Sequence, residues 1–288
     1  MRNKNNKKLS EFFMASITHG AALTTLGILS FLVIFIFVKG VFHITPSLFS
    51  PSYNSQNVSL TPALVSTVLM TPMALLITTP LGVFAAIYLT EYARRGNKWV
   101  GLVRVTTEVL SGIPSIVYGL FGSLFFVLFL GWGYSVLAGV FTLSIMILPL
   151  IMRSSEEALK SVPDAYREGA FGLGAGKLRT VFKIVLPSAM PGILAGVILA
   201  IGRIVGETAA LIYTAGTVAQ IPQNPMQSAR TLSVHMYALS TEGFHTDESY
   251  ATAVVLLFVV ILINAASLKI SRWIGGPNCQ GDQEGGQV

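Results

Sequence analysis

The chain has 288 residues, of which 52% are hydrophobic and 11% charged, and its mean hydropathy is +0.67. Because soluble domains carry about 25% charged residues, this composition excludes an ordinary soluble protein, and the length allows about six membrane spans of ~20 residues. Basic residues of membrane proteins gather on the cytoplasmic side, so the net charge of +6 concerns topology, and we exclude nucleic acid as a partner.

The first half of the chain predicts two spans joined by an outside loop. The apolar stretch at about 17–40 follows a basic start and precedes no small-residue cleavage site, which favours a retained span over a signal peptide. Residues 41–60 lack Lys and Arg and are expected outside. The second span, 61–90, contains Pro72 and Pro80, so we expect it to be kinked or locally unwound.

Four further spans are predicted, at about 109–130, 135–152, 188–213 and 250–270. The first of these opens with SGIPSIVYGLFG, whose small residues at helical spacing let another helix approach closely. The segment 214–249 is expected outside, with a short interfacial or re-entrant helix that is about half the length of a span.

The distribution of basic residues supports six spans with both termini cytoplasmic. Sixteen of the nineteen Lys and Arg residues then lie inside. The other three are Lys39 and Arg230 at the outer side and Arg203 within a span.

A polar, glycine-containing segment, 153–187, separates two of these spans and is longer than a simple connection needs to be. Ser154 and Glu157 fit a capping box that would start a short helix. Pro163 and Asp164 would start a second helix, and LRTVFKIVL would form a third. Glycines between the last two permit a tight turn with positive φ: Gly172, Gly174 and Gly176.

Within this segment, Glu168-Gly169-Ala170 is followed after three residues by Gly174 and after nine more by Ile184-Val185-Leu186-Pro187. This pattern resembles the EAA loop of binding-protein-dependent ABC importer permeases, with Gly169 at a position where that family most often has alanine. The resemblance implies an all-α integral membrane protein with six transmembrane helices and the type I importer permease core (MetI-like).

The same resemblance implies that the segment docks on a cytoplasmic ATPase. The expected coupling residues are Tyr166, Glu168, Gly169, Ala170, Gly174, Ile184, Leu186 and Pro187. The chain would divide into 1–60 (tail, first span and outside loop), a permease core at 61–272, and a disordered tail at 273–288. The alternative interpretation of the segment is a basic amphipathic loop on lipid headgroups.

No catalytic or metal chemistry is predicted in the chain itself. GLGAGK (Gly172 to Lys177) lacks the spacing of a Walker A motif and has Leu178 where Ser or Thr would bind magnesium. ATP and magnesium are therefore expected on a partner ATPase. The single cysteine, Cys279, and four histidines without ligand spacing predict no metal site.

A charged pair inside the membrane is the main candidate for substrate contact. Arg203 and Glu207 are four residues apart in the predicted fifth span and are expected on one helix face, beside Thr208. One hypothesis is that the pair only fastens this span to its neighbours. The other is that Arg203 lines a path for an anionic solute, because a guanidinium binds oxyanions well.

The sequences RIVGETAALIYTAG and GIPSIVYGLFG resemble the phosphate-specific permeases of this family, nearest to the PstA type. That resemblance implies a bacterial or archaeal plasma membrane and four kinds of partner: a PstC-type second permease, a PstB-type ATPase dimer, a PstS-type phosphate-binding protein and membrane lipid. Alternatives are the PstC type itself, a permease for another oxyanion or small solute, a secondary transporter, or a regulatory membrane protein.

Overall fold

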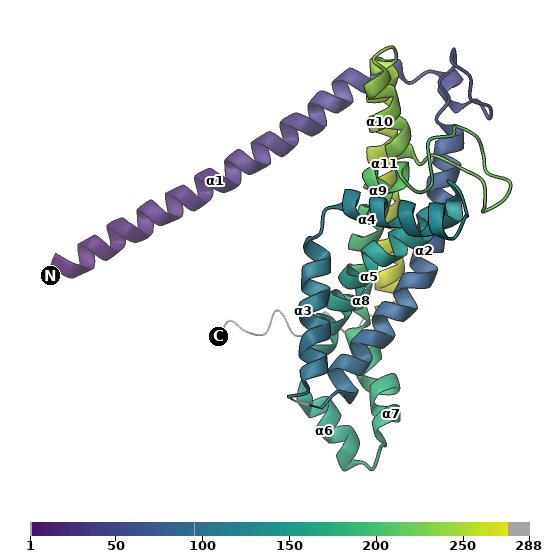
Figure 1. Ribbon diagram of the computed structural model, residues 1–288. Helices are drawn as coiled ribbons and strands as arrows, with labels where there is room; N and C mark the ends of the chain where they lie inside the picture. Colours follow the sequence, from purple (N-terminus) through teal and green to yellow (C-terminus); the bar gives the residue numbers. More distant parts are fainter. Residues whose placement is uncertain (1, 95, 276–288) are drawn as a thin grey trace.

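The computed structural model describes residues 2–94 and 96–275, and within these ranges the chain is helical without strands (Figure 1). The longer helices are α1 (Arg2–Gly40), α2 (Thr61–Ile87), α3 (Lys98–Gly112), α4 (Ser115–Gly122), α5 (Val136–Lys160), α8 (Leu186–Gly206), α10 (Leu232–Glu242) and α11 (Thr246–Gly275). Shorter helices are α6 (Asp164–Gly172), α7 (Lys177–Thr180) and α9 (Ala209–Ile212), with 3-10 turns η1 (Val41–His43) and η2 (Pro46–Phe49) and π-helical segments η3 (Tyr88–Tyr92), η4 (Ser123–Phe129) and η5 (Val181–Val185).

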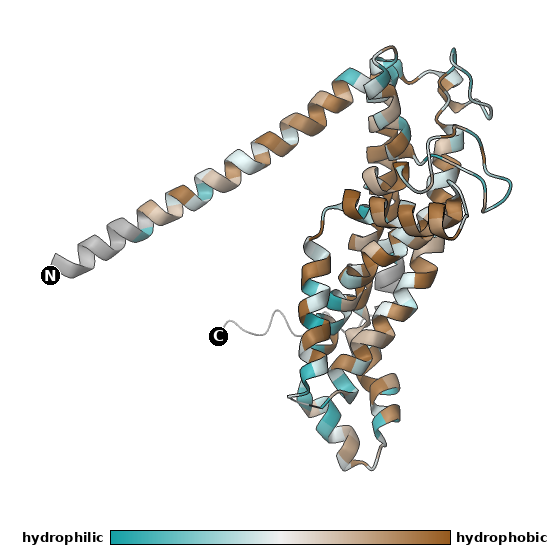
Figure 2. Cartoon of the chain, in the orientation of Figure 1, coloured by the Kyte–Doolittle hydropathy of each residue, from teal (hydrophilic) through white to brown (hydrophobic). Residues whose placement is uncertain are grey.

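Helix α5 forms the centre of the bundle, packed between α2 and α8. The side chains at this contact are apolar and inaccessible to solvent, among them Met70, Leu143, Met146, Ile147, Ile151 and Leu211. Outer surfaces are also apolar, and hydrophilic residues gather at the two ends of the bundle (Figure 2). Apolar residues both inside and outside are what a bundle surrounded by lipid requires.

Small residues allow the helices to approach one another closely. A Cβ atom added at Gly82 would lie 2.8 Å from Ile151 on α5, and one at Gly192 would lie 2.7 Å from Ala158. An added Cβ at Gly122 would collide with Thr142 Oγ1 and with Thr214. Close packing of small residues supplies much of the attraction between helices in lipid, where there is no hydrophobic driving force between them.

Five helices are long and apolar enough to cross a membrane, and the bent pair of α3 with α4 and η4 makes a sixth candidate. The prediction of a single span at 109–130 is wrong in its geometry. Lys98–Gly112 and Ser115–Phe129 meet at 100°. Ile113 and Pro114 form the break. Ile113 has the extended backbone that a residue before proline favours (φ −72°, ψ 132°), and this conformation ends the first helix.

Helix α2 runs without interruption through Pro72 and Pro80, so the expected local unwinding does not occur. Hydroxyl groups one or two residues before the prolines donate to backbone carbonyls one turn earlier: Thr71 to Thr67 and Thr78 to Ala74. The regular α-helix gives way to a wider π-helical turn only at the end of the span, in η3.

Two predicted helix boundaries around the polar segment are also wrong. Ser154 and Glu157 do not cap a new helix, because α5 continues to Lys160 and Ser154 Oγ donates to the carbonyl of Ile151 within it. Helices α7, η5 and α8 form one helix from Lys177 to Gly206. The predicted span at 188–213 therefore starts too late and ends too late.

The N-terminal helix lies largely outside the central bundle. Helix α1 extends away from it and contacts it only near its C-terminal end, where Gly40 fits against the backbone of Tyr250 on α11 (Figure 1). Of the predicted disordered tail, residues 273–275 continue α11, and the rest, with Cys279, lies outside the described residues.

We predict that Gly122→Val destabilises the protein by about 1–3 kcal/mol, because the new methyl groups overlap Thr142 and Thr214. The measurement is the midpoint of chemical unfolding in mixed micelles. Gly27→Val on α1 is the matched control, since nothing lies within 4 Å of an added Cβ there. Equal midpoints for the two variants would contradict the packing described for α4.

Candidate functional site

The polar end of the bundle is built around helix α6. It begins at Asp164 directly after Pro163, which has the extended backbone of a residue preceding a helix, and the acid lies where the helix dipole favours negative charge. It ends in a turn in which Gly174 has φ +79° and donates its N–H to Phe171. Gly174 is the one glycine of the expected three with positive φ.

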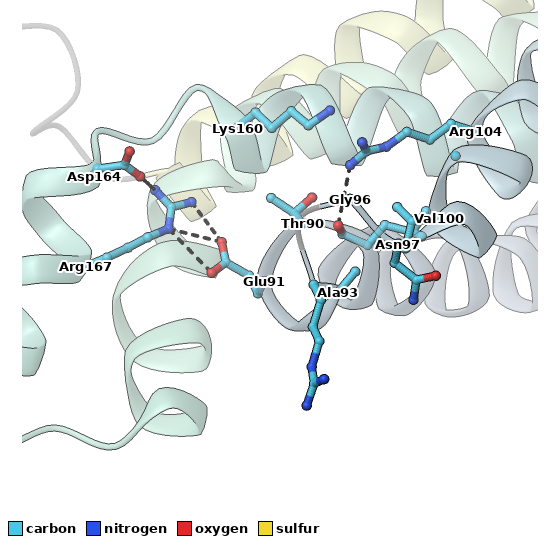
Figure 3. Close-up of a pocket in the computed structure, with 13 residues that line it drawn as sticks. Thr90, Glu91, Ala93, Gly96, Asn97, Val100, Arg104, Lys160, Asp164 and Arg167 are labelled. Atoms are coloured by element: carbon cyan, nitrogen blue, oxygen red, sulfur yellow. Dashed lines mark hydrogen bonds and ion pairs between the residues drawn. The ribbon is translucent and has the colours of Figure 1, made fainter.

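Arg167 on α6 connects three elements of the chain (Figure 3). Its Nη2 donates to Glu91 Oε1 at 2.8 Å and to the carbonyl of Leu159 at 2.9 Å. Its Nη1 donates to the carbonyl of Val162 at 2.8 Å and to Asp164 at 3.1 Å, and its Nε donates to Glu91 at 3.1 Å. One guanidinium thus joins α6 to η3, which continues α2, and to the C-terminal end of α5.

The Arg167–Glu91 pair is largely removed from water, with side-chain exposures of 15% and 9%. An arginine fork that binds a carboxylate through two nitrogens is strong and directional. The remaining donors are used on carbonyls at the C-terminal end of α5, which lack partners within that helix. We therefore regard the end of α2, the end of α5 and α6 as one mechanical unit.

A row of exposed apolar side chains lies at the far tip of the molecule, on α6, α7 and η5. Leu173 in the turn is 92% exposed and Leu178 is 66% exposed. Tyr166, Phe171 and Phe182 are exposed as well. Leu173 and Leu178 were not among the residues predicted from the EAA pattern, although a leucine between two glycines in a polar turn was a usable signal.

The predicted coupling residues fall into two groups. Those accessible from outside the chain are Tyr166, Glu168, Gly169, Gly174 and Pro187. Ala170 is buried and Ile184 and Leu186 are partly buried. These three therefore contact this chain itself. The expectation that Ala170 lets α6 seat closely on another protein is wrong, because its side chain faces inward.

The helix that follows the turn at Gly174 runs from Lys177 back into the bundle. Val181, Val185, Ala189 and Ile193 pack against Ala86 and Ile87 of α2 and Ala158 and Leu159 of α5. The π-helical turn η5 lies at this contact and leads into α8. The helix that starts at Lys177 thus reaches Arg203 without a break.

Arg203 lines a cavity of about 600 Å³ between α8 and α11. Leu150, Ala195, Ile198, Leu199 and Gly202 make most of its wall apolar, and Asn264 contributes an amide. The Oδ1 atom of Asn264 is buried without a hydrogen-bond partner in the described part of the chain. The cavity therefore combines a cation with a polar group that has unused hydrogen-bonding capacity.

Arg203 and Glu207 do not form the predicted pair. Helix α8 ends at Gly206 and Glu207 has an extended backbone, so the two residues no longer share a helix face. The carboxylate of Glu207 accepts the N–H of Ala210 and thereby caps α9. The ion pairs among the described residues do not include these two. The four-residue spacing could not show that the helix ends between them.

Glu207 and Thr208 belong to different surroundings from Arg203. Glu207 is buried, and its carbonyl accepts the Ser233 hydroxyl of α10 at 2.6 Å. Thr208 lines a separate cavity of about 580 Å³ with Tyr213 and Tyr237. Of the three residues predicted for the substrate path, only Arg203 therefore lines the cavity that contains Asn264.

A second buried arginine was missed at the opposite end from α6. Arg230 is 5% exposed and its guanidinium lies 4.5 Å from the centre of the Tyr53 ring. His235 on α10 stacks edge-on against the same ring. Burial, and secondarily the charge of Arg230, lowers the pKa of His235 to about 3, so the imidazole is neutral. The sequence predicted this segment as an outside loop.

A family model for the inner membrane component of binding-protein-dependent transport systems matches residues 78–275, which contain α6, Arg167 and Arg203. The chain belongs to this family. This permease is 39% identical over 219 residues to the probable ABC transporter permease protein YqgI of Bacillus subtilis, covering 70% of this chain and 73% of that protein. It is 37% identical over 206 residues to phosphate transport system permease protein PstA 2 of Mycobacterium bovis, covering 70% and 67%.

A solved structure of the MetNI methionine ABC transporter in an inward-facing conformation resembles this permease with a TM-score of 0.58. The two are 23% identical, and the match covers 75% of this chain and 94% of that one. This likeness concerns the fold alone. With the family match, it confirms the type I ABC importer permease core expected from the EAA pattern.

We predict that Arg167→Met and Glu91→Gln each destabilise the permease by about 3 kcal/mol, because each leaves a largely buried charge without its partner. The double variant should lose less stability than the sum of the losses in the two single variants, with a coupling energy of about 1–2 kcal/mol. The measurement is a double-mutant cycle of chemical unfolding in mixed micelles.

The matched control is the exposed pair Arg153–Glu157, at 3.0 Å with exposures of 56% and 65%. The same substitutions there should change stability by less than ~0.5 kcal/mol. A coupling energy at Arg167–Glu91 no larger than at the control pair would contradict its role in joining α2 to α6.

Proposed function

We propose that this permease is the PstA-type transmembrane subunit of an ATP-driven importer of inorganic phosphate. The observation that carries the proposal is the 37% identity over 206 residues with a phosphate transport system permease. The arginine that lines a membrane cavity is compatible with an anionic substrate. Another oxyanion is the nearest alternative, since a guanidinium does not by itself distinguish phosphate from other tetrahedral anions.

In this proposal Arg203 attracts phosphate within the membrane. A charged group inside a bundle is costly in lipid and marks functional positions. Phosphate that passes Arg203 would exchange hydration for charge-assisted hydrogen bonds to the guanidinium. Since Glu207 caps α9, its role is to hold the backbone turn after α8 rather than to weaken the hold of Arg203 on the anion.

ATP hydrolysis takes place on a separate ATPase subunit, which would bind ATP and magnesium. The apolar tip formed by Leu173, Phe171 and Leu178 supplies the exposed surface that such a partner would cover. Movement of that tip is passed to α2 and α5 through Arg167 and into the membrane through the helix Lys177–Gly206.

The remaining partners follow from the same assignment. A PstC-type permease would cover the apolar outer faces of α3 and α4, where Val105, Val109, Ile116 and Leu120 are exposed. A PstB-type ATPase dimer and a PstS-type phosphate-binding protein would act at opposite faces of a bacterial or archaeal plasma membrane. Both chain termini are expected in the cytoplasm.

We predict that Arg203→Ala lowers phosphate uptake by about 10–100-fold, because it removes charge-assisted hydrogen bonds of about 1.5–3 kcal/mol. Arg203→Lys should retain part of the activity, since it keeps the charge but not the planar donors. Uptake of radiolabelled phosphate by membrane vesicles, with assembly checked by co-purification, is the measurement. Uptake by Arg203→Ala at the rate of the unmodified permease would overturn the role of this residue.

We predict that Leu173→Asp reduces recovery of the ATPase with this permease by at least tenfold, because it places a charge in the centre of the apolar tip. Phe42→Asp is a matched control. Phe42 is also highly exposed, but it lies in η1, directly after α1 and far from α6. The measurement is the ATPase-to-permease ratio after affinity purification. An unchanged ratio for Leu173→Asp would mean that the ATPase docks elsewhere.

A further inference from the structure

A cavity of about 660 Å³ lies beside the Arg167 cluster and has no part in the proposed transport path (Figure 3). Its walls come from η3, the turn that leads into α3, α3 itself, the C-terminal end of α5 and the start of α6. It thus lies at the end of the bundle that carries α6. A volume of this size accommodates a small-molecule group.

The charges around the cavity are unevenly distributed. Four cationic side chains line it, and two carboxylates, Glu91 and Asp164, do so as well. Among the described residues, both of these carboxylates accept side-chain hydrogen bonds from Arg167 and from no other side chain. The other three cations, Arg94, Arg104 and Lys160, therefore face the cavity without a lining carboxylate of their own.

Arg104 and Lys160 share one acid behind the cavity wall. Arg104 Nε lies 2.7 Å from Glu156 Oε1, and Lys160 Nζ lies 2.6 Å from the same oxygen. Glu156 is buried, whereas the side chains of the two cations are 43% and 51% exposed. One buried carboxylate thus holds two cationic side chains in place. Glu108, Arg153 and Glu157 line a second pocket with the same two cations, so the excess of positive charge is confined to the lining of the first cavity.

Hydrogen-bond donors also remain available on these side chains. An ammonium has three donors and a guanidinium five. The contacts of Lys160 and Arg104 with Glu156 are ion pairs without hydrogen-bond geometry, and the Nη2 atom of Arg104 donates to the carbonyl of Leu89 at 3.5 Å. The unused donors suit an anion with several oxygens, such as a phosphate group.

The same elements carry exposed aromatic residues of the kind found at a membrane interface. Trp99 at the start of α3 is 74% exposed, and Tyr88 and Tyr92 of η3 are 59% and 39% exposed. Tryptophan and tyrosine gather at the level of lipid headgroups. Basic pockets between transmembrane helices at the cytoplasmic face bind anionic headgroups.

We propose that this cavity is a phosphate-group site, occupied by the headgroup of an anionic phospholipid from the inner leaflet and contacted by Arg94, Arg104 and Lys160. A free phosphate ion offers the same chemistry, and the aromatic surround favours the lipid. The bound headgroup holds the start of α3 against the end of α5, beside the Arg167–Glu91 pair that fixes the position of α6.

The test is lipid binding to the full-length permease purified within its transport complex, measured by native mass spectrometry and by retention of radiolabelled phosphatidylglycerol. We compare the unmodified chain with Arg94→Gln/Lys160→Gln and with Arg179→Gln/Lys183→Gln. The control variant removes the same charge from exposed positions on α7 and η5. A parallel arm uses inorganic phosphate in phosphatidylcholine nanodiscs, with the PstS-type protein removed.

We expect phosphatidylglycerol retention to fall at least tenfold in Arg94→Gln/Lys160→Gln and to stay within twofold of normal in the control. Arg94→Gln alone should give an intermediate loss, and it keeps the contact of Lys160 with Glu156 in case the double variant fails to assemble. Binding of inorganic phosphate, lost in the same variant, would support the site with the free ion as its ligand. Equal retention in all variants, or equal loss in the control, would overturn the proposal.

Discussion

The arginine fork of Arg167 is the contact that holds together the end of this permease that carries α6. Its five N–H groups are directed to a carboxylate of η3, to one carbonyl at the end of α5 and one just after it, and to an acid of its own helix. Helix α6 has nine residues, too few to be stable alone in water. Its position therefore depends on this arginine and on the apolar contacts of its neighbours.

The second constraint is the continuous helix that follows the turn at Gly174. Thirty residues, from Lys177 to Gly206, form one span, which corresponds to a length of about 45 Å. This helix packs along α2 and α5, and it connects the turn at Gly174 with the cavity of Arg203 without a break. The π-helical turn η5 lies where this helix meets α2 and α5, and such turns often occur at functional positions.

Most of the architecture could be predicted from composition and charge, because lipid requires long apolar helices and the positive-inside rule is strong. The EAA spacing also located α6 and the turn at Gly174 correctly. What could not be predicted depends on tertiary contacts. The helix break at Gly206, which separates Arg203 from Glu207, is stabilised by the contact of Ser233 with the Glu207 carbonyl, 26 residues away in sequence.

The pairing of Glu91 with Arg167 also depends on a tertiary contact that the sequence could not predict. The two residues are 76 positions apart, so no local pattern indicates that they pair, although Glu91 directly follows a predicted span and Arg167 lies in the polar segment 153–187. The resemblance to the EAA loop placed Ala170 among the coupling residues, and its burial shows that small residues serve contacts within a chain as readily as contacts between chains. Arg230 was missed because a lone arginine in a predicted outside loop is usually solvated.

The most direct test of the account is ATP-dependent uptake by the unmodified permease reconstituted with its co-purified partners in proteoliposomes. Radiolabelled phosphate and radiolabelled sulfate are supplied in parallel, each with the extracytoplasmic binding protein that co-purifies. The account predicts that phosphate accumulates only when ATP and magnesium are present on the ATPase side, and that sulfate does not accumulate. Accumulation of sulfate with no uptake of phosphate, or phosphate uptake that is independent of ATP, would contradict it.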